Sequence, residues 1–256
     1  MGELKFTQIE GIPLIQAGDN IAEILLYSIK NQEILIEDGD ILAVTSKIIS
    51  KAEDRLVYLN EVQPSEKALE LGKIINRDPR LMELVLSESK EIVRATEQAI
   101  IVEHKLGFIC ANAGIDHSNV QGKYGKKEDW YLLLPQVPDQ SAERIRDYFK
   151  EKTDKDIGVI VIDSHGRPWR KGTVGVIIGT SQVPALVDLR GKSDLFGYHL
   201  KISEVAAGDE LAGAASMMMG QADEKIPAIH VKGFPYQLRN SSIAEVLRSK
   251  NLDLFR

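Results

Sequence analysis

The hydrophobic pattern of the chain contains short apolar runs bounded by turn residues, which are typical of buried β-strands. The clearest run is VIVID, which ends at Asp163. We predict strands over residues 5–11, within 37–46, and over 156–163, 173–181 and 226–233, with a β-rich stretch over 91–114.

Segments of helical periodicity separate these strands. Between residues 19 and 31, Ile21, Ile24, Leu25 and Ile29 fall on one face, and Asp19 is expected to cap the helix. Further helices are predicted from Pro64 towards Asn76, from Asp78-Pro79 onward, and over 139–153, 204–220 and 241–250. Because strands and helices do not follow a strict βαβ order, the pattern favours an α+β fold with mixed sheets and flanking helices.

Composition and charge exclude several classes of protein. Of 256 residues, 43% are hydrophobic and 27% charged, which is ordinary for a soluble globular chain. The net charge of −6 argues against non-specific nucleic-acid binding. The single cysteine, Cys110, cannot form an internal disulfide, the charged N-terminus is no secretory signal, and no run approaches the roughly 18 apolar residues of a membrane span. We therefore expect a cytoplasmic protein without nucleic-acid or membrane partners.

The strand that ends at Asp163 is followed by a hydroxyl group and by several cations. Asp163 and Ser164 offer the hard oxygen ligands that Mg²⁺ and Mn²⁺ prefer. A solvated turn explains the same residues, and the pattern leaves both interpretations open. A phosphatase of the haloacid dehalogenase type needs a second Asp where His165 stands, which argues against that class. The cations, which could neutralise phosphate oxygens, are Arg167, Arg170 and Lys171.

A second apolar strand, in the segment CANAGIDHSN, is followed by polar groups of the same kind. Asp116 could be another metal carboxylate, and Asn119 could hydrogen-bond a ligand. An Asx turn is the alternative, since Asp and Asn favour such turns by themselves. His117 has no partner histidine at ligand spacing, so we interpret it as a loop histidine.

Two further segments are weaker candidates. The segment TSKIISKAEDR contains Ser46, Lys47 and Lys51, which could bind phosphate groups, although lysines are common on surfaces. In MMMGQADEKIPA, Gln221, Asp223 and Glu224 could reach a metal or the edge of a nucleotide base, but the residues by themselves favour a polar connecting loop. The chain contains no P-loop motif and no G-x-G-x-x-G motif, and no side chain is assigned as a nucleophile or a general base.

The ordered set of EGIPLI, TSKIISKAEDR, ANAGIDHSN, DSHGRPWRKGTVG and MMMGQADEKIPA resembles the coenzyme F420-0:L-glutamate ligase (gamma-glutamyl ligase) family over nearly the whole chain. Each motif alone is weak, but their order and spacing are specific. Some members carry a C-terminal flavin-reductase-like domain. Since this chain ends at Arg256, it resembles the single-domain form, with one ligase domain over 1–256 and an intertwined homodimer as the implied assembly.

The resemblance implies an acid–amino-acid ligase that uses GTP and two Mg²⁺ or Mn²⁺ ions, and allows K⁺ as a further cation. Such enzymes add L-glutamate, and then γ-linked glutamates, to a deazaflavin precursor, and an acyl phosphate is the expected intermediate. Gln221, as a neutral amide, is the weakest of the implied metal ligands, and His165 receives no role. The implied metal ligands are Asp116, Asp163, Ser164 and Gln221. The implied GTP site is Gly11, Ile12, Pro13, Leu14, Ser46, Lys47, Lys51, Asn119, Met219, Gly220, Gln221, Ala222, Asp223, Glu224, Lys225 and Ile226.

Charge alone, not the motif, suggests that Arg167, Arg170 and Lys171 bind the acidic acceptor. Two alternatives to the ligase stay open. One is a ligase of the same architecture that acts on a different acceptor. The other is a catalytically silent nucleotide-binding module, against which the paired carboxylates Asp116 and Asp163 argue.

Overall fold

A computed structural model describes residues 2–253, so Met1 and residues 254–256 of the predicted domain lie outside the described part. The content of helices and mixed sheets confirms the predicted α+β class. The strands are β1 (Lys5–Gln8), β2 (Ile41–Thr45), β3 (Leu56–Tyr58), β4 (Ser89–Ala95), β5 (Ile100–His104), β6 (Ile109–Ala111), β7 (Trp130–Leu132), β8 (Gly158–Arg167), β9 (Arg170–Ser181), β10 (Val187–Asp188), β11 (Glu204–Val205) and β12 (Ala228–Lys232). The helices are α1 (Ile21–Asn31), α2 (Ser46–Ala52), α3 (Glu66–Ile75), α4 (Pro79–Ser87), α5 (Pro138–Thr153) and α6 (Ala207–Met219).

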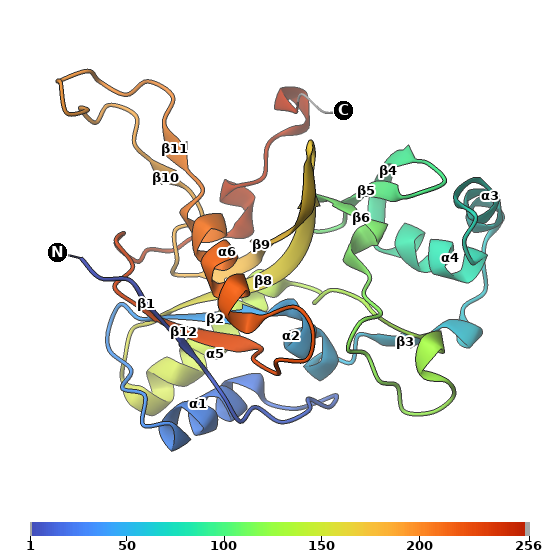
Figure 1. The fold of residues 1–256 in the computed structure, drawn as a ribbon, viewed down its shortest axis with the longest axis horizontal. Coiled ribbons are helices and arrows are strands. Elements are labelled where there is room, and N and C mark those ends of the chain that lie inside the picture. The colour runs from blue at the N-terminus through green and yellow to red at the C-terminus, as the bar shows by residue number, and fades with distance from the viewer. Residues whose placement is uncertain (1, 254–256) are drawn as a thin grey trace.

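The central sheet has the strand order β1-β12-β2-β8-β9, with α1 and α5 on one face and α6 on the other (Figure 1). Its β2 and β8 run parallel, in register from Ile41 opposite Gly158 to Thr45 opposite Ile162, and its other neighbouring strands are antiparallel. Parallel strands end at the same edge of a sheet, so the residues that follow Thr45 and Ile162 are brought together.

Side-chain alternation in β2 explains why this strand reads as a continuous apolar run. Leu42 and Val44 point into the core cluster that contains Leu25 of α1. Ile41 and Ala43 point into the opposite cluster, which contains residues of α6. Successive strand residues face opposite sides, and both sides of this sheet are covered, so the four buried positions from Ile41 to Val44 are all apolar.

A lateral lobe is built from the sheet β4-β5-β6 with α3 and α4, at the right of Figure 1. Met82 of α4 and Val102 of β5 belong to the same core cluster as Leu25, so the apolar interior is continuous between the lobe and the central sheet. The short pair β3–β7 lies below this lobe in the figure. Among the described residues, no helix combines the length and the apolar content that crossing a membrane requires.

The predicted end of a strand at Asp163 is wrong, because β8 continues to Arg167 as one half of a hairpin with β9. The parallel partner β2 stops opposite Ile162, but antiparallel pairing with β9 supplies backbone hydrogen bonds as far as Arg167 opposite Arg170. Asp163 therefore lies where the strand leaves the covered sheet. Residues 163–176 form a projecting hairpin, the β8–β9 arm (Figure 1).

Two predictions for helices need correction. The cap of α1 is Asn20, whose side chain accepts from the Glu23 amide, while Asp19 accepts from the Gln16 amide. The predicted helix over 241–250 is wrong, because only the short 3₁₀ turns Ile243–Glu245 and Lys250–Leu252 form. The segment is held instead by long-range hydrogen bonds: the Ile243 amide donates to Asp139, and Ser241 and Glu245 accept from the amides of Ala185 and Leu186.

Candidate active site

The carboxyl edge of β2 and β8 brings α2 next to Asp163. Helix α2 begins directly after β2, so Ser46 lies in its first turn beside the neighbouring strand. The Ser46 hydroxyl donates to Asp163 Oδ1 at 2.7 Å. Parallel pairing of β2 with β8 thus joins two motifs that are 117 residues apart in the sequence.

The loop that carries Asp116 reaches the same edge. Reciprocal backbone hydrogen bonds of 2.9 and 2.8 Å pair Asp116 with Leu132 and fix the loop beside β7. The Lys47 ammonium forms an ion pair with the Asp116 carboxylate and donates to Ser118 O at 2.6 Å. Burial by itself would raise the pKa of Asp116, but the hydrogen bond and charge of Lys47, with further hydrogen bonds from Ser118, outweigh it and lower that pKa.

Lys51 lies one helical turn after Lys47, so both ammonium groups occupy the same side of α2. Lys51 Nζ donates to Asn119 O at 2.8 Å. Burial and the nearby charge of Lys47 lower the pKa of Lys51, and Asp116 opposes that shift in part. Two ammonium groups on one side of α2 provide the positive charge that binding of an anion requires.

The loop that follows α6 closes another side of this edge. Asn119 Nδ2 donates to Ala222 O at 2.7 Å, which ties residues 219–226 to the loop of Asp116. Gln221 Oε1 accepts from the Ser164 hydroxyl at 3.0 Å, and its amide nitrogen donates to Ser216 at 3.0 Å. Glu224 accepts from the Ala222 amide, which lowers the pKa of Glu224 and holds the loop in a tight turn.

Asp163 and Ser164 are consecutive residues of β8, so their side chains leave opposite faces of the strand. Asp163 faces α2 through Ser46, whereas Ser164 faces α6 and Gln221. The predicted ligands thus fall into two groups, one of carboxylates and one of a hydroxyl and an amide. Within residues 2–253, no group of three His, Cys, Asp or Glu side chains could hold a metal by itself.

The segment with Gly11, Ile12, Pro13 and Leu14 passes close to these elements. On one side of it, the Ile9 amide donates to Ala228 O, directly after the 219–226 loop. On the other side, the Gly18 amide donates to Ala52 O at the end of α2. The chain between these anchors therefore runs from the loop of Gln221 to the helix of Lys51, and the Leu14 side chain is exposed.

His165, which sequence reasoning left without a role, lies at the site. Its Nε2 is 3.1 Å from Asp163 Oδ2, and its ring lies 5.1 Å from that of Phe108. The spacing of two residues along a strand places His165 and Asp163 on the same face, which is the sequence signal that could have revealed this contact. His117, in contrast, directs Nδ1 to the carbonyl of Trp130 at 2.9 Å.

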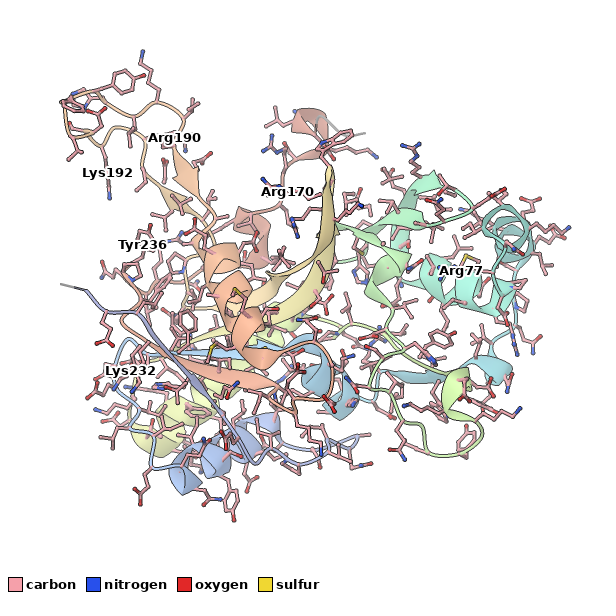
Figure 2. All side chains as sticks on the ribbon, in the orientation of Figure 1. Arg77, Arg170, Arg190, Lys192, Lys232 and Tyr236 are labelled. Atoms are coloured by element: carbon pink, nitrogen blue, oxygen red, sulfur yellow. The ribbon has the colours of Figure 1, made fainter. Side chains whose placement is uncertain are left out.

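The three cations expected beside Asp163 are not brought to it within one chain. Arg167 and Arg170 face each other at the end of the β8–β9 arm, and Figure 2 labels Arg170 near its tip. Arg167 lies four positions after Asp163 along the extended strand, which corresponds to about 13 Å. The turn between the two arginines carries Trp169, which is 88% exposed.

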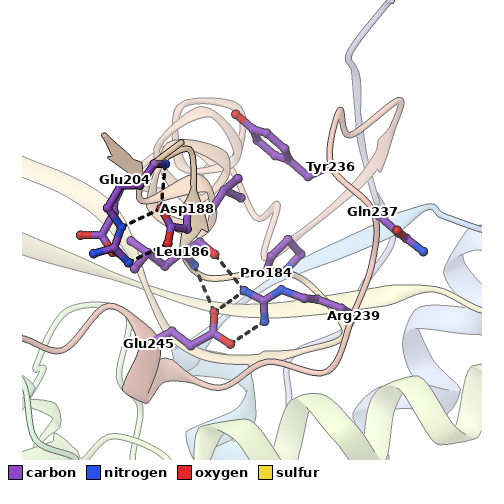
Figure 3. A pocket seen from close by; sticks show the side chains of 10 residues that line it. Pro184, Leu186, Asp188, Glu204, Tyr236, Gln237, Arg239 and Glu245 are labelled. Atoms are coloured by element: carbon purple, nitrogen blue, oxygen red, sulfur yellow. Dashed lines mark hydrogen bonds and ion pairs between the residues drawn. The ribbon is translucent and has the colours of Figure 1, made fainter. Parts of the chain in front are cut away.

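Two cavities lie apart from this edge. One of about 530 Å³ opens beside β10 and is lined by Leu186, Asp188 and Tyr236, among others (Figure 3). Its charged groups are already paired, Arg239 with Glu245 at 2.6 Å and Arg190 with Asp188 at 2.6 Å. The other, of about 330 Å³, lies beside β3. There the ring of Tyr124, in the loop over 121–129, contacts the rings of Tyr58 and Trp130. These three residues form a small aromatic core.

Comparison with known proteins identifies relatives along the whole chain. The family model described as F420-0:Gamma-glutamyl ligase matches residues 11–233. A protein named coenzyme F420:L-glutamate ligase from Methanothermobacter thermautotrophicus is 41% identical over 250 residues, which cover 97% of each chain. The proteins of the same name from Methanopyrus kandleri and Methanocaldococcus jannaschii are also 41% identical, covering 100% and 96% of this chain and 100% and 94% of theirs. The chain therefore belongs to the F420-0:gamma-glutamyl ligase family.

Proposed function

We propose that this protein is a GTP- and divalent-metal-dependent ligase that joins L-glutamate to the deazaflavin precursor coenzyme F420-0 and then adds further γ-linked glutamates. Family membership and the names of the relatives support the glutamate ligation. The observation that carries the proposal is the meeting of Lys47 and Lys51 with Asp116 and Asp163 at one edge of the sheet. This edge offers cations and carboxylates together, as phosphoryl transfer requires.

The nucleotide phosphates would lie along the partly exposed side of α2 that carries Lys47 and Lys51. Lys47 and Lys51 would neutralise phosphate oxygens. Ser46 lies next to Lys47 in the first turn of α2. The segment 11–14 and the loop 219–226 flank this side, and Asn119 bridges to the loop through Ala222. These elements would enclose the remainder of GTP.

A divalent ion fits the donors that are present. Asp116, Asp163, Ser164 and Gln221 provide only oxygen ligands, the type that Mg²⁺ and Mn²⁺ prefer. Asp116 and Asp163 would hold the first ion, and the group of Ser164 and Gln221 lies where a second could be held. Two carboxylates are too few to hold an ion alone, so phosphate oxygens of the nucleotide would complete its coordination. Bound there, the ion would neutralise charge on the phosphates.

The reaction needs an activated carboxyl group. A carboxylate oxygen of the acceptor attacks the γ-phosphorus of GTP, the bond to the β-phosphate oxygen breaks, and GDP leaves. The glutamate amine then attacks the acyl carbon, phosphate departs, and the amine loses a proton to solvent or phosphate. Lys47 and Lys51 stabilise charge on the phosphates during the transfer, so no protein nucleophile is required.

A mass-spectrometric ligation assay tests this proposal. Purified protein is incubated with F420-0, L-glutamate, GTP and Mn²⁺ or Mg²⁺, and the products are weighed. Acceptor masses increased by one or more glutamyl units are expected, and parallel reactions with ATP and with added K⁺ define the nucleotide and the monovalent ion. GTP turnover without glutamyl transfer would redirect the proposal to another acceptor, and binding without turnover would identify a silent module.

We also propose that the active assembly is a homodimer. The β10–β11 arm (residues 187–205) projects from the body of the subunit (Figure 1). Its outer part exposes apolar side chains, with Leu195 97%, Phe196 95% and Ile202 88% exposed. Such side chains are unfavourable in water unless another surface covers them. A second copy would cover them, and could also bring its β8–β9 arm, with Arg167, Arg170 and Lys171, to the acidic acceptor.

A further inference from the structure

We propose that His165 is a positioning residue that holds the Asp163 carboxylate in the orientation needed to bind the divalent ion. The inference rests on the proposed function, in which Asp163 is a metal ligand. His165 itself would not touch the ion. It would act through Asp163, by restricting the rotation of the carboxylate.

The Asp163 carboxylate is contacted on both oxygens by different elements. Ser46 of α2 donates to Oδ1 at 2.7 Å, and His165 Nε2 lies 3.1 Å from Oδ2. Each carboxylate oxygen can take part in more than one contact, so both retain capacity for a cation. Metal-binding carboxylates are held by such neighbouring groups, which reduces the motion that must be lost when the ion binds.

His165 is suited to this role because its ring is itself fixed. Its side chain is 12% exposed, and the ring packs 5.1 Å from Phe108. Phe108 in turn stacks on His104, with centroids 5.2 Å apart and planes 10° from parallel. His104 is anchored through Nδ1, which accepts from the Leu106 amide at 3.0 Å. This chain of ring contacts, stacked between His104 and Phe108 and tilted between Phe108 and His165, therefore supports His165 from the lateral lobe.

In the part of the chain that the structure describes, the Nε2 atom of His165 is a buried polar atom without a hydrogen-bond partner. Nε2 is inaccessible to solvent, and within the described residues it has no hydrogen bond of good alignment. Its contact with Asp163 has the distance of an ion pair but not the angle of a hydrogen bond. The nearby carboxylate of Asp209 already accepts from the Ile177 amide at 3.0 Å. A small rotation of the Asp163 carboxylate would satisfy Nε2, and such contacts tighten when a ligand binds.

Packing against Phe108 is the competing explanation for a histidine at this position, and two substitutions separate the explanations. His165→Phe preserves an aromatic ring but removes the polar atom. His165→Gln loses the ring but can place an amide donor near the position of Nε2. We would measure Mn²⁺ affinity by electron paramagnetic resonance with GDP and without acceptor or glutamate, so that no turnover is required.

We expect His165→Phe to weaken Mn²⁺ binding about 10- to 100-fold, and His165→Gln to stay within about threefold of the unaltered protein. Unchanged affinity in both variants, equal loss in both, or loss only in the Gln variant would overturn the proposal. The melting temperature of each variant, measured without Mn²⁺, identifies any loss that reflects unfolding. For a variant found unfolded at the assay temperature, the comparison is made at a lower temperature where it is folded.

Asp163→Asn serves as the reference in the same titration. If it weakens Mn²⁺ binding while His165→Phe does not, only the role of His165 is wrong. If Asp163→Asn leaves Mn²⁺ affinity unchanged, the metal site of the proposed function is itself wrong.

Discussion

Ser46 donates a hydrogen bond of 2.7 Å to Asp163, and this contact joins the start of α2 to the strand that leaves the central sheet. The next residue of α2, Lys47, pairs with Asp116 from a third segment. Two consecutive residues of one helix thus position the two carboxylates on which the proposed metal chemistry depends.

Replacing Asp163 tests that chemistry most directly. In Asp163→Asn the amide oxygen can still accept from Ser46, but the negative charge is lost. We expect kcat/KM for ligation to fall roughly 10³-fold, since charge stabilisation by a bound metal contributes several kcal/mol. The melting temperature should change little. Asp154→Asn, at the exposed end of α5, is the matched control, and ligation by Asp163→Asn at the unaltered rate would contradict the assignment.

Lys47→Ala should weaken nucleotide binding more than it slows the chemical step. Hydrogen bonds to charged groups contribute about 1.5–3 kcal/mol, so the KM for GTP should rise roughly 10- to 100-fold. Steady-state kinetics with varied GTP measures this effect. Lys123→Ala removes a lysine that pairs with Asp54 at 3.2 Å outside the site, and it should leave the KM unchanged. An equal KM in both variants would remove Lys47 from the nucleotide site.

The buried His104 predicts a loss of stability in mild acid. Burial, with the nearby Arg55, lowers the pKa of His104 to about 4, whereas an unfolded histidine titrates near 6.5. The unfolded chain therefore binds more protons between these values. The stability due to neutral His104 is complete above pH 6.5 and decreases as the pH falls towards about 4.

The corresponding decrease in the free energy of unfolding amounts to about 3 kcal/mol at most. Urea denaturation at several pH values between 7 and 4 measures it. In His104→Asn, whose side-chain oxygen can replace Nδ1 as acceptor, the pH slope should be smaller. The exposed His199→Asn is the control, and an identical slope in His104→Asn would disprove the linkage.

Close packing between β9 and α6 predicts different effects of alanine at two glycines of one hairpin. A Cβ on Gly175 would lie 2.5 Å from Ser216 Cβ and 2.6 Å from Ala212 O, whereas one on Gly166 would meet nothing within 4 Å. Gly175→Ala should cost about 1–3 kcal/mol of stability. Because Ser216 accepts from Gln221, the same variant should also disturb the 219–226 loop. Thermal unfolding compares the two, and equal melting temperatures would contradict the packing argument.

The exposed β10–β11 arm predicts how the assembly responds to substitution. Replacing Leu195 and Phe196 together by serine should convert a dimer to monomers, because the apolar area that holds the copies together is removed. Light scattering coupled to size-exclusion chromatography measures the mass. The double substitution of the distant, exposed Leu35 and Tyr27 by serine is the control. A dimer that survives the arm substitutions would exclude this arm as the main contact.

The sequence by itself determined the elements whose pattern depends on local burial. The run VIVID predicts β8 because that strand is covered on both faces, and the amphipathic periodicity of 139–153 predicts α5 within one residue. The positions of Asp116 and Asp163 after apolar runs predict polar groups at the sheet edge. Local signals suffice in these cases, since strand alternation and helical periodicity depend on residues that are close together in the sequence.

Only the tertiary structure decided which strand ends meet, how far β8 extends and what His165 contacts. The parallel pairing of β2 with β8 places Ser46 beside Asp163, and pairing with β9 carries Arg167 and Arg170 outward. The C-terminal segment follows hydrogen bonds to Asp139 rather than its own helical periodicity. These outcomes depend on partners distant in sequence, whose backbone and side-chain hydrogen bonds override the local preferences of the chain.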